Sequence, residues 1–453
     1  MSVTPDPSPD AAPGGGRLRR ALLSGATPIL AATVVAGASG YLVTTLVGAT
    51  RPPAEYAGFA VFWSTLYLVI AALSGLQQEI TRGTHPRPAD AGRGPRFPLA
   101  ARFAASVAAI TAIVVLAATP FLTALIPGEG VTPALAIALG TASYVVVAVL
   151  AGTLYGLSLW PAIGLMISID GVLRLVGVVI VILAGGGISE LMWAVVLPFP
   201  ITPLVLWWFL RRRVRGRSQL DVGPRRLTWN IARTLAASVS TGILISGYPL
   251  LLSATSVGVP AARLGALVFG ISLVRAPLVI VVLSLQSFLV VRFRDDAAHA
   301  YRLFVRLALL IAVVAAVLAV IAAFVVPAVL DALWPAYHLD GWTVAGLVAT
   351  SGVLGILCVS GPLTLARGRH GAYTAGWVVA AVTTIGLLLV PLAIEERMVL
   401  SLAVGPVIGV IVHTIASRHP APIDPRDEVL DGRAVTDAAA QSTGEAGGAG
   451  GEA

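Results

Sequence analysis

Long runs of apolar residues, broken at intervals by Pro, Gly and charged residues, fill almost the whole chain. A helix needs about 20 mostly apolar residues to cross a bilayer, so each run of this length predicts one membrane-spanning helix. The runs cover 22-47, 55-78, 98-124, 131-157, 161-184, 188-210, 228-254, 264-291, 304-329, 341-366, 371-394 and 398-416. The pattern therefore predicts an all-α polytopic membrane protein with about 12 transmembrane helices.

The composition excludes an ordinary water-soluble protein. Of the 453 residues, 57% are apolar and 11% are charged, and the mean hydropathy is +0.90, whereas soluble domains carry about 25% charged residues. The single cysteine, Cys358, lies in an apolar run. It excludes an intramolecular disulfide and a cysteine-based zinc site, and it fits a small buried apolar residue.

The charges between the runs are distributed unevenly between the two sides of the membrane. All 30 basic residues are Arg, and the net charge is +8. When successive loops are assigned to alternate sides, almost every loop Arg falls on one side, and the other side holds Arg51, Arg263 and Arg397. Since cytoplasmic loops carry the excess of basic residues, both termini are expected in the cytoplasm of a cell-membrane protein. Arg clusters between apolar runs argue against a nucleic-acid partner.

The chain divides into five parts on this basis. We expect a disordered basic cytoplasmic N-terminal tail at 1-20, a first six-helix bundle at 21-210 and a cytoplasmic Arg-rich linker at 211-227. A second six-helix bundle follows at 228-416 and a disordered cytoplasmic tail at 417-453. The two tails are rich in Pro, Gly, Ala and charged residues without apolar periodicity, which is typical of disorder.

An internal repeat relates the two predicted bundles. At a constant offset of 207 residues, Gly40-Tyr41 matches Gly247-Tyr248, Pro53-Ala54 matches Pro260-Ala261, Gly58 matches Gly265, and Val61-Phe62 matches Val268-Phe269. The offset corresponds to six spans, so both halves would enter the membrane in the same direction. Such parallel repeats, related by an axis along the membrane normal, occur in transporters. The repeat therefore favours two bundles that move about a central site.

The stretch Gly40 to Arg82 carries a resemblance to a known family. It reads GYLVTTLVGATRPPAEYAGFAVFWSTLYLVIAALSGLQQEITR, with the element Tyr56-Ala57-Gly58 after a short turn and a Gly75 to Glu79 segment at its end. It resembles the first two helices of the polysaccharide and lipid-linked oligosaccharide flippases of the multidrug/oligosaccharidyl-lipid/polysaccharide exporter superfamily. The resemblance implies an alternating-access transporter that moves a polyprenyl-pyrophosphate-linked glycan, or a related amphiphile, between leaflets.

Two alternatives stay open beside a flippase or exporter of a lipid-linked oligosaccharide or polysaccharide precursor. One is a cation- or proton-coupled exporter of small amphiphiles, and the other is a polytopic enzyme or assembly factor for envelope polymers. The chain lacks a nucleotide-binding GxxxxGK[ST] loop, HExxH and Gly-x-Ser-x-Gly. We therefore expect no enzyme activity, catalytic residue, metal or cofactor. Membrane lipids, the lipid-linked glycan and other envelope-glycan biosynthesis proteins are the expected partners of a monomer.

Three charged residues lie deep within predicted spans, where charge is costly and is typically functional. Asp170 and Arg174 are four residues apart in one span, so they share a helical face and can pair. Arg275 has no acidic residue in its own span. Guanidinium groups match phosphate oxygens, so Arg174 and Arg275 are candidates for a cationic cavity that binds a pyrophosphate. A purely structural ion pair is the alternative for Asp170 and Arg174.

Four further polar residues are candidates at the ends of spans. Gln78 and Glu79 lie at the cytoplasmic end of the second span, where a lipid head group would enter. Glu190 and His413 are candidates for proton or cation coupling. A cluster at Pro198, Pro200 and Pro203 predicts a break or kink in the sixth span, and Pro249 and Pro277 predict the same in the second half.

Overall fold

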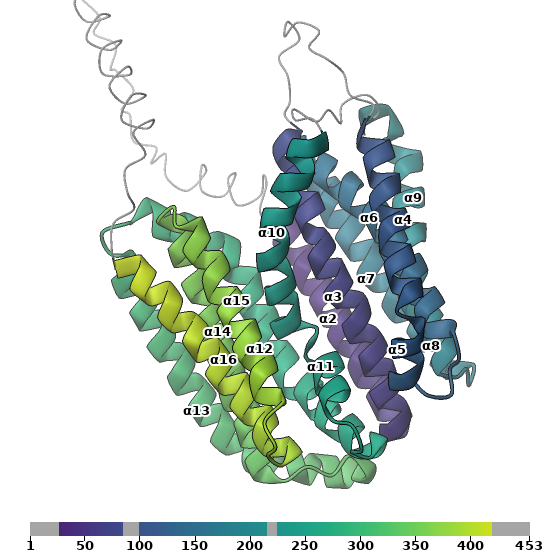
Figure 1. Ribbon diagram of the computed structural model, residues 1–453, viewed down its shortest axis with the longest axis vertical. Coiled ribbons are helices and arrows are strands. Elements are labelled where there is room, and N and C mark those ends of the chain that lie inside the picture. The colour runs from purple at the N-terminus through teal and green to yellow at the C-terminus, as the bar shows by residue number, and fades with distance from the viewer. Residues whose placement is uncertain (1–26, 85–98, 215–223, 419–453) are drawn as a thin grey trace, which may run out of the picture.

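The computed structural model describes residues 27–84, 99–214 and 224–418. The described chain consists of helices, in two bundles that diverge toward one end (Figure 1). The first bundle contains α2 (Thr27–Thr50), α3 (Pro53–Gly83), α4 (Leu99–Ala117), α5 (Thr119–Leu125), α6 (Thr132–Gly156), α7 (Trp160–Leu183), α8 (Ile188–Val196) and α9 (Pro198–Val214). The second contains α10 (Pro224–Ile245), α11 (Tyr248–Thr255), α12 (Ala261–Asp295), α13 (Ala300–Leu333), η2 (Pro335–Tyr337), α14 (Gly341–Ala366), α15 (His370–Leu388) and α16 (Ile394–Arg418).

Each of the twelve predicted runs falls on one helix or on one pair of consecutive helices. Within the described ranges, nine helical segments are long and apolar enough to cross a membrane, or eleven if each bent pair is one span. The predicted run at 264-291 falls on the 35-residue helix α12. The most apolar stretch of α13 is only 11% buried. A helix so apolar and so exposed must face lipid, which confirms the membrane protein class.

The helix bounds can be compared with the expected linker and tails only in part. Both ends of the expected linker at 211-227 are helical, because α9 continues to Val214 and α10 already begins at Pro224. The last helix ends at Arg418, close to the predicted start of the C-terminal tail. The N-terminal tail at 1-20 and nearly all of the C-terminal tail lie outside the described residues.

The predicted helix breaks are confirmed in two places, and the one at Pro277 is wrong. The chain bends by 72° between α10 and α11, next to Pro249. In the sixth span, α8 ends at Val196 and α9 begins at Pro198, so the helix is interrupted at Leu197, although the two helices form one span. Pro277 lies inside unbroken α12. A proline removes one backbone donor, but neighbouring helices can keep such a helix nearly straight.

The internal repeat places matching residues at equivalent positions, with one difference. Pro53 is the first residue of α3, and Pro260 is the N-cap of α12. Gly40-Tyr41 lies inside continuous α2, whereas Gly247-Tyr248 lies at the bend between α10 and α11. The residue after Tyr248 is Pro249, while the residue after Tyr41 is Leu42. One proline therefore accounts for the bend in the second copy.

The two bundles contact each other through an aromatic group that we call the closed-end cluster: Tyr56, Phe269, Trp334 and Tyr337. The ring centroids of Tyr56 and Phe269 are 5.4 Å apart, and those of Phe269 and Tyr337 are 4.5 Å apart. The Tyr337 hydroxyl donates to the carbonyl of Arg51 at 2.8 Å. Aromatic pairs at such distances add packing energy beyond their buried area, so the bundles are held together at the start of α3.

Helix α14 begins at an N-cap outside the membrane-spanning segment. The Asp340 carboxylate accepts hydrogen bonds from the Thr343 backbone N–H at 2.8 Å and from the Thr343 hydroxyl at 2.7 Å. Partial burial raises the pKa of Asp340, but the bonds from Thr343 outweigh it and hold this pKa below its ordinary value. The cap therefore stabilises the fold above the unfolded-state carboxyl pKa of about 3.9 and loses this effect as the pH falls through the lower folded-state pKa.

We expect Asp340→Ala to lower the free energy of unfolding by about 1 kcal/mol at neutral pH, because the first turn of α14 loses its cap. Asp340→Asn is the matched control, since Asn also caps helices but does not titrate. Thermal unfolding of the purified protein between pH 7 and pH 2 measures both effects, because the cap loses its stabilising effect only below the unfolded-state pKa. Equal unfolding temperatures for the Ala and Asn variants at pH 7 would contradict the capping role.

Candidate functional site: a polar cavity between the bundles

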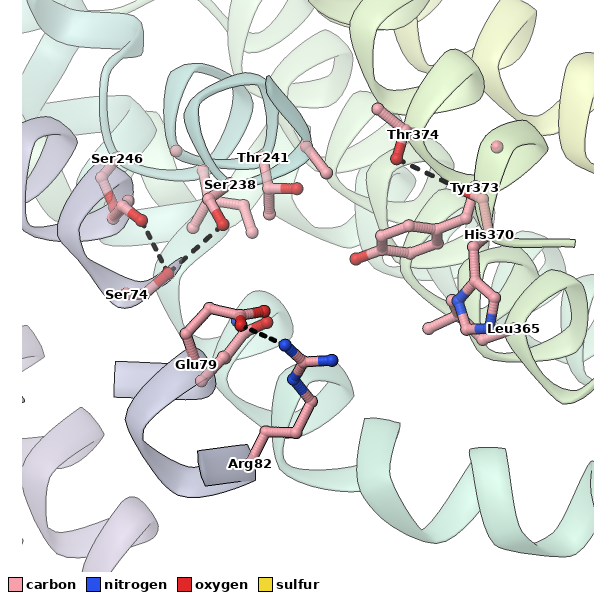
Figure 2. A pocket seen from close by; sticks show the side chains of 16 residues that line it. Ser74, Glu79, Arg82, Ser238, Thr241, Ser246, Leu365, His370, Tyr373 and Thr374 are labelled. Carbon is pink, nitrogen blue, oxygen red and sulfur yellow. Dashed lines mark hydrogen bonds and ion pairs between the residues drawn. The ribbon is translucent and has the colours of Figure 1, made fainter. Parts of the chain in front are cut away.

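A cavity of about 1070 Å³ lies between the bundles, at the end opposite the closed-end cluster. Its walls come from the last turns of α3, the second half of α10 and the junction of α14 and α15 (Figure 2). The polar side chains in the wall are Ser74, Gln78, Glu79, Arg82, Ser238, Thr241, Ser246, His370, Tyr373 and Thr374. The side chains of Arg82 and His370 are exposed, so the cavity reaches the surface at this end.

The end of α3 supplies the charged part of the wall. Glu79 is 8% exposed and accepts a hydrogen bond from Arg82 at 2.8 Å. Gln78 points away from the core and is exposed. Of the seven candidate site residues predicted from the sequence, these two, Gln78 and Glu79, are in the cavity wall.

Close packing against α6 fixes this end of α3. A Cβ added to Gly152 would lie 2.8 Å from the carbonyl oxygen of Gln77, and one added to Gly156 would collide with the Thr84 backbone. The two glycines are four residues apart on one face of α6 and allow the helices to approach closely. This contact holds the turn that carries Gln78 and Glu79 in place.

Helix α10 supplies hydroxyl groups, and its bend depends on the first bundle. The Ser74 and Ser238 hydroxyl oxygens are 3.4 Å apart. At the bend, the Ser64 hydroxyl of α3 donates to the carbonyl of Ser246 at 2.6 Å and accepts from the N–H of Leu250 at 3.2 Å. In a continuous helix these two backbone groups would bond each other. The Ser64 hydroxyl therefore bridges the two backbone groups and replaces the missing helical hydrogen bond.

The start of α15 is a part of the site that the sequence reasoning missed. His370, Tyr373 and Thr374 all face the cavity (Figure 2), and the Thr374 hydroxyl donates to the carbonyl of His370 at 3.2 Å. The available signal was the presence of His, Tyr and Thr within five residues at the start of an apolar run. Because these residues lie at the end of a span, they were not distinguished from an interfacial boundary.

Asp170 and Arg174 lie inside the first bundle, away from the wall of the large cavity. Arg174 is 5% exposed; its Nη2 donates to Asp170 at 2.7 Å and its Nε to the carbonyl of Val195 at 3.1 Å. The guanidinium also lies 4.7 Å from the ring centroid of Phe199. Asp170 lines a smaller cavity of about 150 Å³ that also includes Tyr144, Tyr155 and Thr202. The predicted pairing is confirmed, and the expectation that Arg174 lines the central cavity is not met.

Arg275 of α12 is also outside the cavity wall. It is 5% exposed and donates through Nη2 to the carbonyl of Leu244, in the last turn of α10 before the bend. The last carbonyls of a helix have no partner within the helix, so Arg275 satisfies one of them. Its Nε and Nη1 have no hydrogen-bond partner among the residues that the structure describes. Arg275 thus contacts the end of α10, a helix of the cavity wall, without lining the cavity itself.

The two coupling candidates have different surroundings. Glu190 is exposed at the start of α8, where its carboxylate accepts from the N–H of Gly187 at 2.8 Å, so it acts as a helix cap. His413 of α16 is fully buried; its Nδ1 is 2.8 Å from the Ser360 hydroxyl and its Nε2 is 3.0 Å from the carbonyl of Tyr373. Within the described ranges, no group of three or more His, Cys, Asp or Glu residues could hold a metal ion.

Solved structures share this fold. An inward-facing multidrug resistance MATE family transporter of the MOP superfamily aligns with a TM-score of 0.57 and 15% identity, over 86% of this chain and 94% of its own. A MOP superfamily transporter from Pyrococcus furiosus, described as having a binding pocket of reverse polarity that suggests a different function, aligns with a TM-score of 0.57 and 15% identity, over 90% and 99% of the two chains. The chain is therefore a multi-pass membrane protein with the two-bundle fold of these transporters.

Sequence relatives are found in mycobacteria, while no family model matches the chain. The uncharacterized protein Rv1510 of Mycobacterium tuberculosis is 30% identical over 395 residues, which cover 86% of this chain and 91% of its own. The uncharacterized protein Mb3654 of Mycobacterium bovis is 28% identical over 392 residues, covering 85% and 90%. The extent of the first of these matches shows that the chain belongs to the same family as Rv1510.

Proposed function

We propose that this protein is an alternating-access transporter that moves a lipid-linked oligosaccharide or polysaccharide precursor across the cytoplasmic membrane. The observation that carries the proposal is the polar cavity between the two bundles. Its closed end is held by the aromatic cluster, and its open end is lined by side chains that suit a sugar. Movement of one bundle against the other about this cavity would expose it to the opposite side of the membrane.

The cavity lining favours a glycan over a small apolar amphiphile. Pockets for drug-like molecules are lined mainly by hydrophobic and aromatic side chains. Here seven of the sixteen lining residues carry an uncharged hydroxyl or amide group: Ser74, Gln78, Ser238, Thr241, Ser246, Tyr373 and Thr374. Hydroxyl and amide groups both donate and accept hydrogen bonds, which matches the hydroxyls of a saccharide. The volume of about 1070 Å³ is slightly above the range of about 300–1,000 Å³ for small-molecule pockets.

The phosphate of such a substrate would bind at the open end of the cavity. Arg82 and His370 are the basic residues in the described wall, and both are exposed there. Three further Arg residues lie beside the open end of the cavity: Arg211, Arg367 and Arg418. By the positive-inside rule, this end of the cavity would face the cytoplasm. The head group of a lipid-linked precursor lies at this depth of the membrane, while its tail can extend between helices. In this proposal Arg82 takes the role first assigned to Arg174 and Arg275.

An exporter of small amphiphiles is the second candidate. It is favoured by the structural similarity to a multidrug resistance transporter. The two candidates differ in what must enter the cavity, because a cationic drug would require apolar and acidic contacts. Of the acidic residues in the described chain, Glu79 is the one in the wall, and it is paired with Arg82.

Reconstitution in proteoliposomes with a labelled polyprenyl-pyrophosphate-linked oligosaccharide tests the proposal. We expect the wild-type protein to move the label to the opposite leaflet and Thr241→Trp to reduce the rate at least about tenfold, because the indole would fill the cavity between α10 and α15. Val320→Trp, on the lipid-exposed face of α13, is the matched control and should transport normally. Efflux of a cationic dye without movement of the glycan lipid would favour the second candidate.

A further inference from the structure

His413 is a fully buried titratable side chain in the second bundle. It lies on α16, which packs against α14 and α15. Imidazole is the side chain whose charge ordinarily changes between pH 5 and pH 8. Gly376 of α15 makes room for the ring, because a Cβ at that position would collide with Nε2. The ring is therefore enclosed by small residues and by groups that can hydrogen-bond to it.

The partners of His413 suit both of its protonation states. Nε2 lies 3.0 Å from the carbonyl of Tyr373, which can only accept, so Nε2 carries a proton in either state. Nδ1 lies 2.8 Å from the Ser360 hydroxyl, which can donate or accept. The same hydroxyl lies 2.8 Å from the carbonyl of Leu357. Ser360 thus has a second acceptor available when Nδ1 no longer needs its proton.

Proton uptake at Nδ1 requires only a rotation of one hydroxyl group. In the neutral ring, the Ser360 O–H donates to Nδ1. When a proton adds to Nδ1, the new N–H donates to the Ser360 oxygen and the Ser360 O–H turns to the carbonyl of Leu357. All hydrogen bonds of the ring are kept in both states, and no heavy atom has to move. A buried charge without such bonds would be far more costly.

Tyr373 connects His413 to the cavity. Its phenol ring is parallel to the imidazole, with planes 2° apart and centroids 5.9 Å apart, and the phenol side chain lines the cavity (Figure 2). An imidazolium beside an aromatic face is favoured electrostatically. A sugar that hydrogen-bonds to the Tyr373 hydroxyl would therefore touch the same residue that accepts from His413.

The other titratable groups near His413 are few. Tyr373 comes from α15, Cys358 and Arg367 come from α14, and Arg367 donates to the carbonyl of Ser417, one turn beyond His413. Arg418 follows on α16 itself. No carboxylate of the described chain is hydrogen-bonded to the ring. His370, one turn before Tyr373 on α15, is exposed at the cavity. A proton at His413 would thus be the charge that changes in the interior of this part of the bundle.

We propose that His413, Ser360 and the Tyr373 carbonyl form a proton-binding site behind the cavity wall, and that proton occupancy of this site is linked to substrate binding through Tyr373. The proton-binding part stands on the hydrogen-bond geometry alone. The link to substrate rests on the proposed transport function.

The first experiment measures proton binding without transport. The full chain, labelled with ¹⁵N-histidine and held in lipid nanodiscs, is titrated from pH 8 to pH 5 by NMR. Among the signals from the six histidines, we expect one that titrates reversibly and is absent in His413→Gln. The midpoint of the titration of this signal should shift in Ser360→Ala. His299→Gln, an exposed histidine outside the site, should leave that signal unchanged. If every signal that titrates survives in folded His413→Gln, the site does not exist.

The second experiment tests the link in proteoliposomes with a polyprenyl-pyrophosphate-linked oligosaccharide as the probe. An imposed gradient of one pH unit should change the wild-type rate by up to about tenfold, the factor that corresponds to one proton, and that of His413→Gln by less than twofold. Equal gradient dependence in the two proteins would overturn the link. Absence of probe movement in the wild type at any pH would instead refute the proposed function, and the NMR titration would still decide proton binding.

Discussion

Replacing Arg174 with Met is expected to destabilise the protein by about 3–5 kcal/mol, the usual cost of removing one partner of a buried ion pair. Met fills a similar volume but leaves the Asp170 carboxylate without its cation. The Asp170 Oδ1 atom already lacks a hydrogen-bond partner within the described residues, so little else can compensate for the charge. Unfolding of the purified protein by heat or by denaturing detergent measures the loss.

The double variant Arg174→Met with Asp170→Leu distinguishes the effect of the unpaired carboxylate from the effect of the lost contacts of Arg174. Replacing a buried ion pair with apolar residues of similar volume is often neutral or stabilising, so the double variant should regain most of the stability lost in the single variant. A single variant that loses less than about 1 kcal/mol would mean that water reaches Asp170 through the small cavity beside it. A double variant as unstable as the single one would assign the effect to the contacts of Arg174 with Val195 and Phe199.

Gly265→Ala should weaken the contact between the bundles at the closed end. A Cβ at this position would collide with the carbonyl of Pro53, and backbone atoms cannot move aside as the tip of a side chain can. Overpacking of this kind costs about 1–3 kcal/mol, although Ala alone would favour the helix by about 1 kcal/mol. Thermal unfolding together with distance measurements between spin labels on α3 and α12 would detect the change.

Gly386→Ala provides the matched control for this prediction. Gly386 is also a helical glycine, but a Cβ there has no neighbour within 4 Å. Its substitution should therefore leave stability unchanged or raise it. If both variants unfold at or above the wild-type temperature, with unchanged distances between the bundles, then the close contact of α12 with Pro53 does not exclude a larger side chain at position 265.

The arrangement of the helices could be predicted from the sequence because a lipid environment imposes a simple requirement. Each span must be about 20 apolar residues long, and this alone identified all twelve runs. The bend at Pro249 could also be predicted, whereas the 53° bend between α4 and α5 was missed despite Pro120 beside it. A proline removes one hydrogen bond, but the surrounding structure decides whether the helix is interrupted, as unbroken α12 around Pro277 illustrates.

The candidate site was only partly predictable, because depth in the membrane does not determine which way a side chain points. Arg174 and Arg275 lie within the predicted spans but face Asp170 and the end of α10 rather than the cavity. Gln78 and Glu79 could be identified because they lie at the cytoplasmic end of the second predicted span, and that end lines the cavity. Tyr373 was missed because its position becomes significant only when α15 is placed opposite α3.

The insertion of Ser64 into the bend of the second bundle has a mechanical consequence. If α3 withdrew from α10 and α11, the Ser246 carbonyl and the Leu250 amide would lose their shared hydroxyl and be left unpaired in an apolar environment. They could recover by bonding to each other, which would straighten the chain at that point. Separation of the bundles is therefore coupled to straightening of the bend between α10 and α11.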